Sequence, residues 1–348
     1  MTPRIAIIGA GLSGLTLANE LAPDAQVSVF EKSRGVSGRM ATRYADPYAF
    51  DHGTQFFTVR TPEFRAHLET LLAQGHVAEW KGNVVTMRVA EPRTTPVLED
   101  RPWLAPHYVP VPNMNQLGKL LAKPLSGPDH AVQNQVVLNT EVAPLAIRDS
   151  LGWHLFDKEC RALGAFDWVV STAPSTQTAR LFGGYLSPAE DLPAVRMLGC
   201  FTLMLGFNKP WDRPWIATKV RGDASDASPL EWIAVNSSKP GRNAKVTSLV
   251  IHSRNDWAQA HIEDEPLGTQ KALLGHLSAL TGIDGLKANY LAMHRWRYAL
   301  VAEPAAHPPL LDSDLQLAST GDWCAASRVE DAWLNAKKLA ESLAQAIR

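Results

Sequence analysis

The chain has few cysteines and no pattern of them that suggests a bridge or a metal site. Of its 348 residues, three are cysteines, at positions 160, 200 and 324, and no two of them form a Cys-x-x-Cys pair. An odd number of scattered thiols argues against a disulfide framework and predicts a cytoplasmic protein whose cysteines are small core residues. No cluster of cysteine and histidine has the spacing of metal ligands, so no metal is expected.

Charge and hydropathy exclude further classes. The 34 basic and 35 acidic residues give a net charge of −1, which argues against broad electrostatic binding to nucleic acid or to an anionic membrane. No run of 18 apolar residues occurs, so no membrane span is expected. Nothing in the sequence indicates an obligate protein partner. With 45 % hydrophobic residues, a chain of this length is typical of a globular protein of about two domains.

The most informative stretch lies near the N-terminus. A short β-branched run at residues 5–8, typical of a buried parallel strand, leads directly into a glycine motif. The motif has the spacing G-x-G-x-x-G and consists of Gly9, Gly11 and Gly14. Helical periodicity over residues 12–21 and a second strand at residues 27–30 follow, so the segment is predicted to be one βαβ unit that ends at Glu31.

The parts of this unit are those that a dinucleotide needs. Gly9 permits a tight turn, Gly11 removes a Cβ where the backbone approaches a pyrophosphate, and Gly14 lets the helix pack close to the sheet. The free N–H groups at the start of the helix, where Leu12 and Ser13 lie, favour the phosphates. The motif therefore predicts dinucleotide binding.

Glu31, which lies 20 residues after Gly11, can accept hydrogen bonds from ribose hydroxyls and would repel a 2′-phosphate. One alternative is an ordinary βαβ unit with a glycine-rich turn. Another is a signal peptide, because Arg4 precedes an apolar run. Asn19 and Glu20 interrupt that run and no small-residue cleavage site fits, which argues against the second alternative.

The loop after Glu31 distinguishes between cofactors. Residues 32–43 are rich in glycine and arginine, where a nicotinamide dehydrogenase would normally continue into another helix. This loop resembles the E-x-x-x-x-x-G-G-R fingerprint of the amine-oxidase-like FAD flavoproteins, with Ser37 in place of the first paired glycine. The resemblance implies that FAD is the cofactor and that Arg39 neutralises its pyrophosphate. It also adds three residues to the cofactor site, namely Lys32, Gly38 and Met40.

Residues 51–57 resemble the D-x-G-x-x-x-F segment that lies against the flavin ring in this family. The resemblance implies that Gln55 and Phe56 lie near the isoalloxazine. It also implies that Thr54 and Phe57 line the substrate pocket. The alternative for this stretch is a hairpin that contains a glycine and contributes aromatic side chains to the core.

Two later segments resemble other parts of the cofactor site. A strand pair is expected over residues 132–142, and Val142 fits the place where a flavoprotein's adenine meets main chain. Near the C-terminus a strand, a Gly-Asp turn and a final helix follow one another. They resemble the family's motif in which the aspartate binds the ribityl chain and the helix N-terminus faces the flavin. The residues concerned are Gly321, Asp322 and Val329.

With residues 109–114 and 294–298, these motifs resemble the renalase family, in particular its bacterial form. The resemblance implies oxidation of abnormal dihydro-NAD(P) isomers, the 2- and 6-dihydro forms, to NAD(P)⁺. Hydride would pass to flavin N5, and O₂ would re-oxidise the flavin to give H₂O₂. Loss of hydride from a dihydropyridine gives an aromatic cation directly, so no proton must leave carbon and positioning can carry most of the catalysis.

The substrate side of the site is expected from alternating strands at residues 185–290. His252 ends one such strand. It could hydrogen-bond the substrate's carboxamide, place positive charge near O₂, or be a hydrogen-bonded structural histidine. Trp296 and Arg297 lie on opposite faces of a later strand. We expect Arg297 beside the flavin, as a second catalytic candidate, and Trp296 in the core where it borders the substrate pocket.

The expected fold is α/β, with a Rossmann-type FAD-binding domain and a second domain built on an antiparallel sheet, as in p-hydroxybenzoate-hydroxylase-like proteins. The first domain is expected to comprise residues 1–60, 113–184 and 291–348, and the substrate domain residues 61–112 and 185–290. Two other functions stay open. One is a flavin amine oxidase, which needs a cage of aromatic side chains and often a lysine-bound water, neither of which the sequence locates. The other is a non-catalytic FAD-binding protein.

Overall fold

The computed structural model describes residues 2–89, 97–126, 134–185, 195–222, 228–302 and 309–347. The chain forms two compact units, and each unit is assembled from separate stretches of sequence. Unit 1 comprises Met1–Met40, Asn115–Arg196 and Val301–Arg348. Unit 2 comprises Ala41–Met114 and Met197–Leu300.

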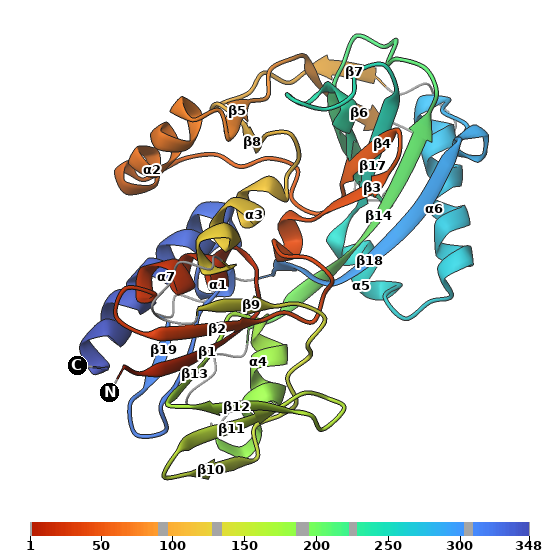
Figure 1. Ribbon diagram of the computed structural model, residues 1–348. Helices are drawn as coiled ribbons and strands as arrows, with labels where there is room; N and C mark the ends of the chain where they lie inside the picture. Colours follow the sequence, from red (N-terminus) through yellow and green to blue (C-terminus); the bar gives the residue numbers. More distant parts are fainter. Residues whose placement is uncertain are drawn as a thin grey trace. The chain divides into compact units, whose positions relative to one another are not determined.

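Unit 1 is built on a six-stranded sheet of order β19-β20-β13-β1-β2-β9, in which β13, β1 and β2 lie side by side (Figure 1). Five strands are parallel and β19 pairs antiparallel with β20 at one edge. The strands are β1 (Arg4–Ile8), β2 (Gln26–Phe30), β9 (Gln135–Val137), β13 (Trp168–Ser171), β19 (Leu310–Asp312) and β20 (Leu317–Ser319). The βαβ unit predicted from the sequence is therefore present, with β1 and β2 paired side by side and β1 near the centre of the sheet.

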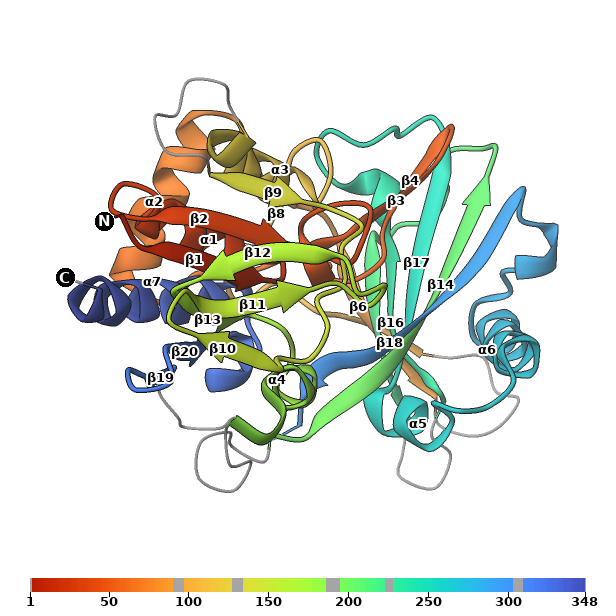
Figure 2. The ribbon, with the colours of Figure 1, turned by 60° about the horizontal axis from the view of Figure 1, so that its bottom comes forward.

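Alternate residues of the central strand pack on opposite faces of this sheet. Ile5 and Ile7 pack against α1 (Leu12–Leu21) and α7 (Val329–Ala346), together with residues that follow α3 (Gln116–Ala122). Ala6 packs on the other face, which a small antiparallel sheet and α4 cover (Figure 2). These elements are β10 (Ile147–Asp149), β11 (Gly152–Phe156), β12 (Ala162–Phe166) and α4 (Ser175–Phe182). Burial on both faces explains why the strand reads as a continuous apolar run.

Unit 2 is built on a seven-stranded sheet of order β18-β14-β17-β16-β15-β6-β7. The pairings described within it are antiparallel except for β15 with β6, which is parallel. The strands are β6 (Val84–Val89), β7 (Val97–Asp100), β14 (Met197–Phe207), β15 (Ala217–Gly222), β16 (Leu230–Val235), β17 (Thr247–Ser253) and β18 (Tyr290–Val301). A mainly antiparallel second sheet confirms the fold class predicted from the sequence.

The two faces of the unit 2 sheet differ. Leu203 and Ile251 point to the face covered by α5 (Asn255–Ala260) and α6 (Pro266–Thr281). Met204 and Val250 point to the opposite face and pack against the hairpin of β3 (Thr42–Ala45) and β4 (Tyr48–Asp51). Because side chains alternate along a strand, His252 in β17 lies on the same face as Val250, on the side of the hairpin. The remaining elements of unit 2 are α2 (Pro62–Ala73), β5 (Val77–Glu79) and β8 (Tyr108–Pro110).

Short 3₁₀ turns complete the two units. They are η1 (Gly38–Met40), η2 (Lys123–Ser126), η3 (Gly183–Tyr185), η4 (Asn236–Ser238), η5 (Gly285–Lys287) and η6 (Asp322–Cys324). Over the part of the chain that the structure describes, every helix is too short or too polar to cross a bilayer.

The units have other boundaries than those the sequence predicts. Residues 41–60, expected in the FAD-binding domain, belong to unit 2 because the β3–β4 hairpin packs on β17 and η4. Residues 291–300 also belong to unit 2, since β18 forms an edge of its sheet. Of the predicted strand pair at 132–142, residues 132 and 133 lie outside the described residues, and only β9 and an isolated bridge at Val142 are strand-like.

Candidate functional site

In the glycine turn of unit 1, a side chain would collide with neighbouring atoms at Gly9 and Gly14 but not at Gly11. Gly9 has a φ of +110°, and its N–H donates to the carbonyl of Phe30 at 2.8 Å. A Cβ on Gly14 would lie 2.0 Å from the carbonyl oxygen of Gly9, so only glycine fits there. A Cβ on Gly11, by contrast, would meet no atom within 4 Å. The position predicted to face a pyrophosphate thus borders open space, at the N-terminal end of α1 where Leu12 and Ser13 follow.

The Glu31 carboxylate ties the end of β2 to this turn. It is 8 % exposed, and its Oε2 accepts a hydrogen bond from the backbone N–H of Ala10 at 2.9 Å. Its Oε1 accepts from the N–H of Ser33 at 2.8 Å. A carboxylate offers about four acceptor positions, so lone pairs remain for ribose hydroxyls. Lys32, the next residue, is exposed beside it.

The arginine-rich loop passes close to the glycine turn. Ser37, which replaces the first paired glycine of the fingerprint, has a φ of +96° and is 2 % exposed. Its N–H donates to the carbonyl of Ala10 at 2.8 Å, and its Oγ donates to the carbonyl of Asn115 at 3.0 Å. A Cβ on Gly38 would lie 3.4 Å from the Cα of Gly11. The serine therefore holds a left-handed conformation that glycine would adopt more easily, and Met40 is buried just beyond it.

Arg39 and Asp322, two residues predicted to bind the cofactor, pair with each other. The guanidinium donates NH1 to Oδ2 at 2.9 Å and NH2 to Oδ1 at 2.5 Å. Oδ2 also accepts from the Ser327 hydroxyl at 2.7 Å, and the Asp322 side chain is 7 % exposed. This bidentate pair brings together the loop after β2 and the turn after β20, which are 283 residues apart in the sequence.

The C-terminal helix starts beside the same turn. The amide of Asn335 donates to the carbonyl of Gly321 at 3.1 Å, and the Ser13 hydroxyl of α1 donates to the carbonyl of Ala332 at 2.9 Å. The first turns of α1 and α7 are therefore neighbours, and Val329 opens α7. Val142 lies farther along the sheet, half-buried against the cluster that contains Phe30 at the end of β2. Unit 1 thus gathers the Gly9–Gly14 turn, Glu31, Arg39 and Asp322, which we call the dinucleotide cradle.

Unit 2 contains a buried group of charges centred on Asp51. The Asp51 side chain is fully buried, and its Oδ2 accepts from Arg242 NH2 at 2.7 Å and from Lys239 Nζ at 3.3 Å. Its Oδ1 accepts from the Thr42 hydroxyl at 2.7 Å and from the Met114 N–H at 3.0 Å. The Lys239 and Arg242 side chains are 0 % and 1 % exposed. We call Asp51, Lys239 and Arg242 the buried charge triad.

The triad perturbs the pKa values of its members. Burial raises the pKa of Asp51, but the two cations outweigh that effect and hold it at about 2. Burial lowers the pKa of Lys239 to about 8, against the opposing attraction of Asp51. Lys239 Nζ also lies 5.3 Å from the centre of the Trp80 ring.

Gln55 connects the triad to His252. Its Oε1 accepts from Lys239 Nζ at 3.3 Å. Its Nε2 donates to the carbonyl of Asp51 and, at 3.0 Å, to that of Gly53, and it lies 3.5 Å from Nε2 of His252. Residue 55 is therefore fixed by partners on both sides of its amide, and Thr54 beside it is half-buried.

The carbonyl of His52 lies among Trp296, Thr202 and His252, and the His52 ring contacts Trp296 and His294. That oxygen accepts from Trp296 Nε1 and from the Thr202 hydroxyl, both at 3.0 Å, and lies 3.3 Å from His252 Nε2. The His52 ring stacks on Trp296, with ring centres 5.2 Å apart, and His294 lies 5.0 Å from His52. Burial lowers the pKa of each of the three histidines to about 4, so all three are neutral at pH 7.

Arg297 and Trp296 differ in their surroundings, as the alternation of the strand predicts, but neither lies as expected. Arg297 is exposed and pairs with Glu263, with its NH2 3.0 Å from Oε2. Trp296 is the residue that lies beside His52, and it is half-buried rather than fully in the core. Residues 296 and 297 do point to opposite faces of β18. The face that packs against His52 carries Trp296 and His294, and Arg297 points away from it.

An aromatic cluster adjoins Gln55. It consists of Phe56, Trp80, Trp103, His107 and Trp232. The centre of the Phe56 ring lies 4.1 Å from that of His107, and Trp103 stacks on His107 at 3.6 Å. Phe57, predicted in the substrate pocket, packs instead against Phe64 and Tyr108 in the core, with ring centres about 6 Å apart. Its neighbour Phe56, predicted beside the flavin, is the one that joins the aromatic cluster.

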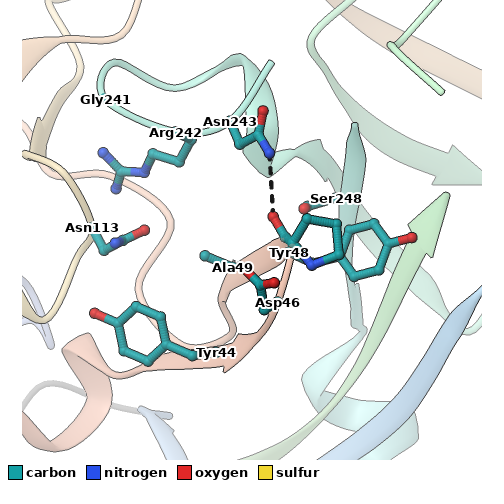
Figure 3. Close-up of a pocket in the computed structure, with 10 residues that line it drawn as sticks. Tyr44, Asp46, Tyr48, Ala49, Asn113, Gly241, Arg242, Asn243 and Ser248 are labelled. Atoms are coloured by element: carbon teal, nitrogen blue, oxygen red, sulfur yellow. Dashed lines mark hydrogen bonds between the residues drawn. The ribbon is translucent and has the colours of Figure 1, made fainter. Parts of the chain in front are cut away.

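A cavity of about 220 Å³ lies against the β3–β4 turn, and Arg242 is the residue of the triad that lines it. Figure 3 shows Arg242, Asn113 and Tyr44 along one side of it and the Asn243 amide donating to the carbonyl of Pro47, at 3.4 Å. Arg242 Nε and Asn113 Oδ1 are buried there without a hydrogen-bond partner in the described structure. None of the residues that the sequence predicts for the site lines this cavity.

Lys239 and Arg242 are the residues that sequence reasoning missed. They belong to the stretch Ser237-Ser-Lys-Pro-Gly-Arg242, which reads as an ordinary polar turn. The signal that could have drawn attention to them is two cations around a Pro-Gly pair directly after a buried strand.

Comparison with known proteins agrees with this architecture. A sequence model described as an NAD(P)-binding Rossmann-like domain matches residues 7–73. A protein from Exiguobacterium sp. 255-15, assigned provisionally as a protoporphyrinogen oxidase, superposes with a TM-score of 0.75 at 13 % identity, with 99 % of both chains covered.

Two other solved structures are similar over the same length. Wild-type putrescine oxidase bound to putrescine has a TM-score of 0.69 at 13 % identity, with 99 % of both chains covered. An oxidoreductase from Methanosarcina mazei has a TM-score of 0.65 at 13 % identity, covering 97 % of this chain and all of the other. At such identities the likeness is one of fold. The chain has a Rossmann-type dinucleotide-binding domain combined with a second, mainly antiparallel sheet domain, which is the fold of these oxidoreductases.

Proposed function

We propose that this chain is an FAD-dependent oxidase that converts 2- and 6-dihydro isomers of NAD(P) to NAD(P)⁺, as in renalases. The observation that carries the proposal is the dinucleotide cradle, in which the Arg39–Asp322 pair joins two fingerprint segments 283 residues apart. The motifs of unit 2 that resemble renalases support the choice of substrate. Free thiols at all three cysteines support the proposed cytoplasmic location.

The residues of the cradle fit FAD. The backbone at Gly11 has open space where a pyrophosphate must approach, and α1 presents its N-terminal N–H groups there. Glu31 would accept from the ribose of the adenosine half, and Asp322 from the ribityl hydroxyls. When bound, FAD supplies a two-electron acceptor at N5 and transfers those electrons to O₂, with release of H₂O₂.

The neutral state of the histidines in unit 2 suits a substrate that loses hydride without the help of a base. His52, His252 and His294 are neutral at pH 7 and would not repel a cationic pyridinium product. The neutral form of His252 argues against the expectation that it places positive charge near O₂. Removing hydride from a dihydropyridine yields an aromatic ring directly, so the task of these residues is orientation and exclusion of water.

An amine oxidase is the second candidate, and two features of unit 2 favour it. The sequence did not locate an aromatic cage or a lysine, whereas the structure has the five-ring cluster around Phe56 and the buried Lys239. A lysine with a pKa of about 8 could exchange protons with a bound amine near neutral pH. Putrescine oxidase is among the proteins with a similar fold.

Anaerobic bleaching of the bound flavin tests these alternatives. Purified protein is mixed in the absence of O₂ with 6-dihydro-NAD, putrescine or ordinary NADH, and absorbance near the flavin maximum is followed. The proposal expects bleaching within seconds by 6-dihydro-NAD and slow bleaching by the other two. Rapid bleaching by putrescine would favour the amine oxidase, and no bleaching by any of them would indicate a protein that only holds FAD. Colourless protein that cannot be reconstituted with FAD would contradict both enzymatic proposals.

A further inference from the structure

His252 lies between two groups that together define which of its nitrogens carries the proton. Its Nε2 is 3.3 Å from the carbonyl oxygen of His52 and 3.5 Å from Nε2 of Gln55. A carbonyl oxygen can only accept a hydrogen bond, so it favours a proton on Nε2. The Gln55 contact would favour the opposite arrangement if the amide group had a hydrogen to donate.

The hydrogens of the Gln55 amide are already used. An NH₂ group has two hydrogens, and they go to the carbonyls of Asp51 and Gly53. The amide cannot rotate by half a turn, because its Oε1 would then face those two carbonyls and its NH₂ group would face the ammonium of Lys239. Gln55 therefore offers His252 no donor. The His52 carbonyl also accepts from Trp296 and Thr202, but an oxygen that can only accept still favours a proton on the nitrogen that faces it, so the geometry assigns the proton to Nε2.

The other ring nitrogen, Nδ1, is then unprotonated and has a lone pair that can accept a hydrogen bond. No hydrogen bond joins His252 Nδ1 to any residue that the structure describes, and the side chain is partly accessible. Protonation of Nδ1 would create an imidazolium beside the buried ammonium of Lys239, which opposes it. The imidazole of His252 is thus held neutral. Its Nε2–H donates to the His52 carbonyl, and its Nδ1 can accept a hydrogen bond from a ligand.

We propose that His252 is a fixed hydrogen-bond acceptor, protonated at Nε2 and unprotonated at Nδ1, and that it selects ligands carrying an N–H or O–H donor. Resting on the function proposed above, the ligand group is the primary carboxamide of a pyridine nucleotide, whose NH₂ donates to Nδ1. His252 is then a specificity residue that recognises the amide nitrogen, and Lys239 and Gln55 are positioning residues that act through it.

The tautomer can be measured without any assumption about the reaction. Long-range ¹H–¹⁵N NMR spectra of the FAD-containing protein distinguish the two neutral tautomers of each histidine, and His252→Gln identifies the resonances of residue 252. The proposal expects a protonated Nε2 and an unprotonated Nδ1 between pH 6 and 8. A protonated Nδ1, or averaged signals from the two nitrogens, would overturn it, whatever substrate the enzyme proves to use.

A charge variant tests the positioning part. Lys239→Met removes the ammonium while keeping a long apolar side chain, so the pKa of His252 should rise from about 4. Lys245→Met, in an exposed stretch of the same unit, is the matched control and should leave that pKa unchanged. A pKa of His252 that is the same in both variants would remove Lys239 from the proposal.

A pair of amides tests the ligand class. Nicotinamide has the N–H donor and N,N-diethylnicotinamide lacks it. The proposal expects the wild-type protein to bind nicotinamide more tightly, by about threefold to tenfold, as one hydrogen bond allows. The preference should vanish in His252→Leu and persist in His261→Leu, a control histidine that is 39 % exposed. Equal binding of the two amides, absence of binding by either, or a preference that survives His252→Leu would overturn this ligand class.

Discussion

Replacing Asp51 by asparagine should destabilise unit 2 strongly, because it removes the only carboxylate of the buried charge triad. The carboxylate accepts from Arg242 at 2.7 Å and from Lys239 at 3.3 Å, and the side chains of all three residues are at most 1 % exposed. An amide of the same shape leaves two cations buried without a counter-charge. Breaking a buried pair in this way typically lowers the free energy of unfolding by about 3–5 kcal/mol.

The same variant has a predictable pH dependence. The folded-state pKa of Asp51 is about 2, below its ordinary value of 3.8, so ionisation of Asp51 stabilises the folded state at pH values above 3.8. That contribution is lost as the pH falls through the window from 3.8 to 2, and amounts to about 2 kcal/mol in total. The difference between wild type and Asp51→Asn should therefore be largest at neutral pH and shrink by about 1 kcal/mol at pH 3.

Urea unfolding followed by tryptophan fluorescence measures both effects. Asp46→Asn, an exposed position on the same hairpin, is the matched control and should behave as wild type. Since the chain has two units, the transition of unit 2 should be followed separately from release of FAD. An Asp51→Asn protein as stable as wild type at pH 7, or a stability difference that grows toward acid, would refute the proposed charge balance.

Other variants test single contacts. Gly11→Ala should keep the thermal midpoint of the apoprotein but weaken FAD retention, because its Cβ enters open space, whereas Gly14→Ala should lower the midpoint, because its Cβ would lie 2.0 Å from a carbonyl; equal effects of both on stability would contradict this reading of the turn. Arg297→Ala should change neither flavin reduction nor the midpoint measurably, since its pair with Glu263 is exposed; a large loss of rate would restore Arg297 as a catalytic residue. The rate of flavin reduction should show no inflection near pH 6.5, because the pKa of His252 is about 4; stopped-flow measurements across pH 5 to 8 check this.

The parts of the fold that were predictable are those whose information is local. The glycine spacing and the apolar periodicity around it lie within one stretch of 28 residues, and the structure has the strand, helix and strand in that order. Helix α2 likewise carries its start signal in adjacent residues, since Thr61 caps it by accepting from the Phe64 N–H at 3.3 Å and proline follows in its first turn.

The rest depended on partners far away in the sequence. Lys239 reads as a residue of a solvated turn until Asp51, 188 positions earlier, is known to lie against it. The choice between Trp296 and Arg297 likewise depends on the His52 carbonyl, 244 positions away, because alternation defines two faces without saying which is covered. The boundaries of the two units depend on distant partners for the same reason, since the β3–β4 hairpin belongs to whichever sheet it packs on.

The interleaving of the two units sets the order in which a growing chain can complete them. Unit 2 has all its described strands once residue 301 has been synthesised, whereas unit 1 still lacks β19, β20 and α7. Arg39 emerges from the ribosome early and must wait for Asp322, so a nascent or truncated polypeptide has no finished place for a nucleotide. Loading with cofactor would then report that synthesis has passed Asp322, and a colourless product would mark a chain that stopped before it.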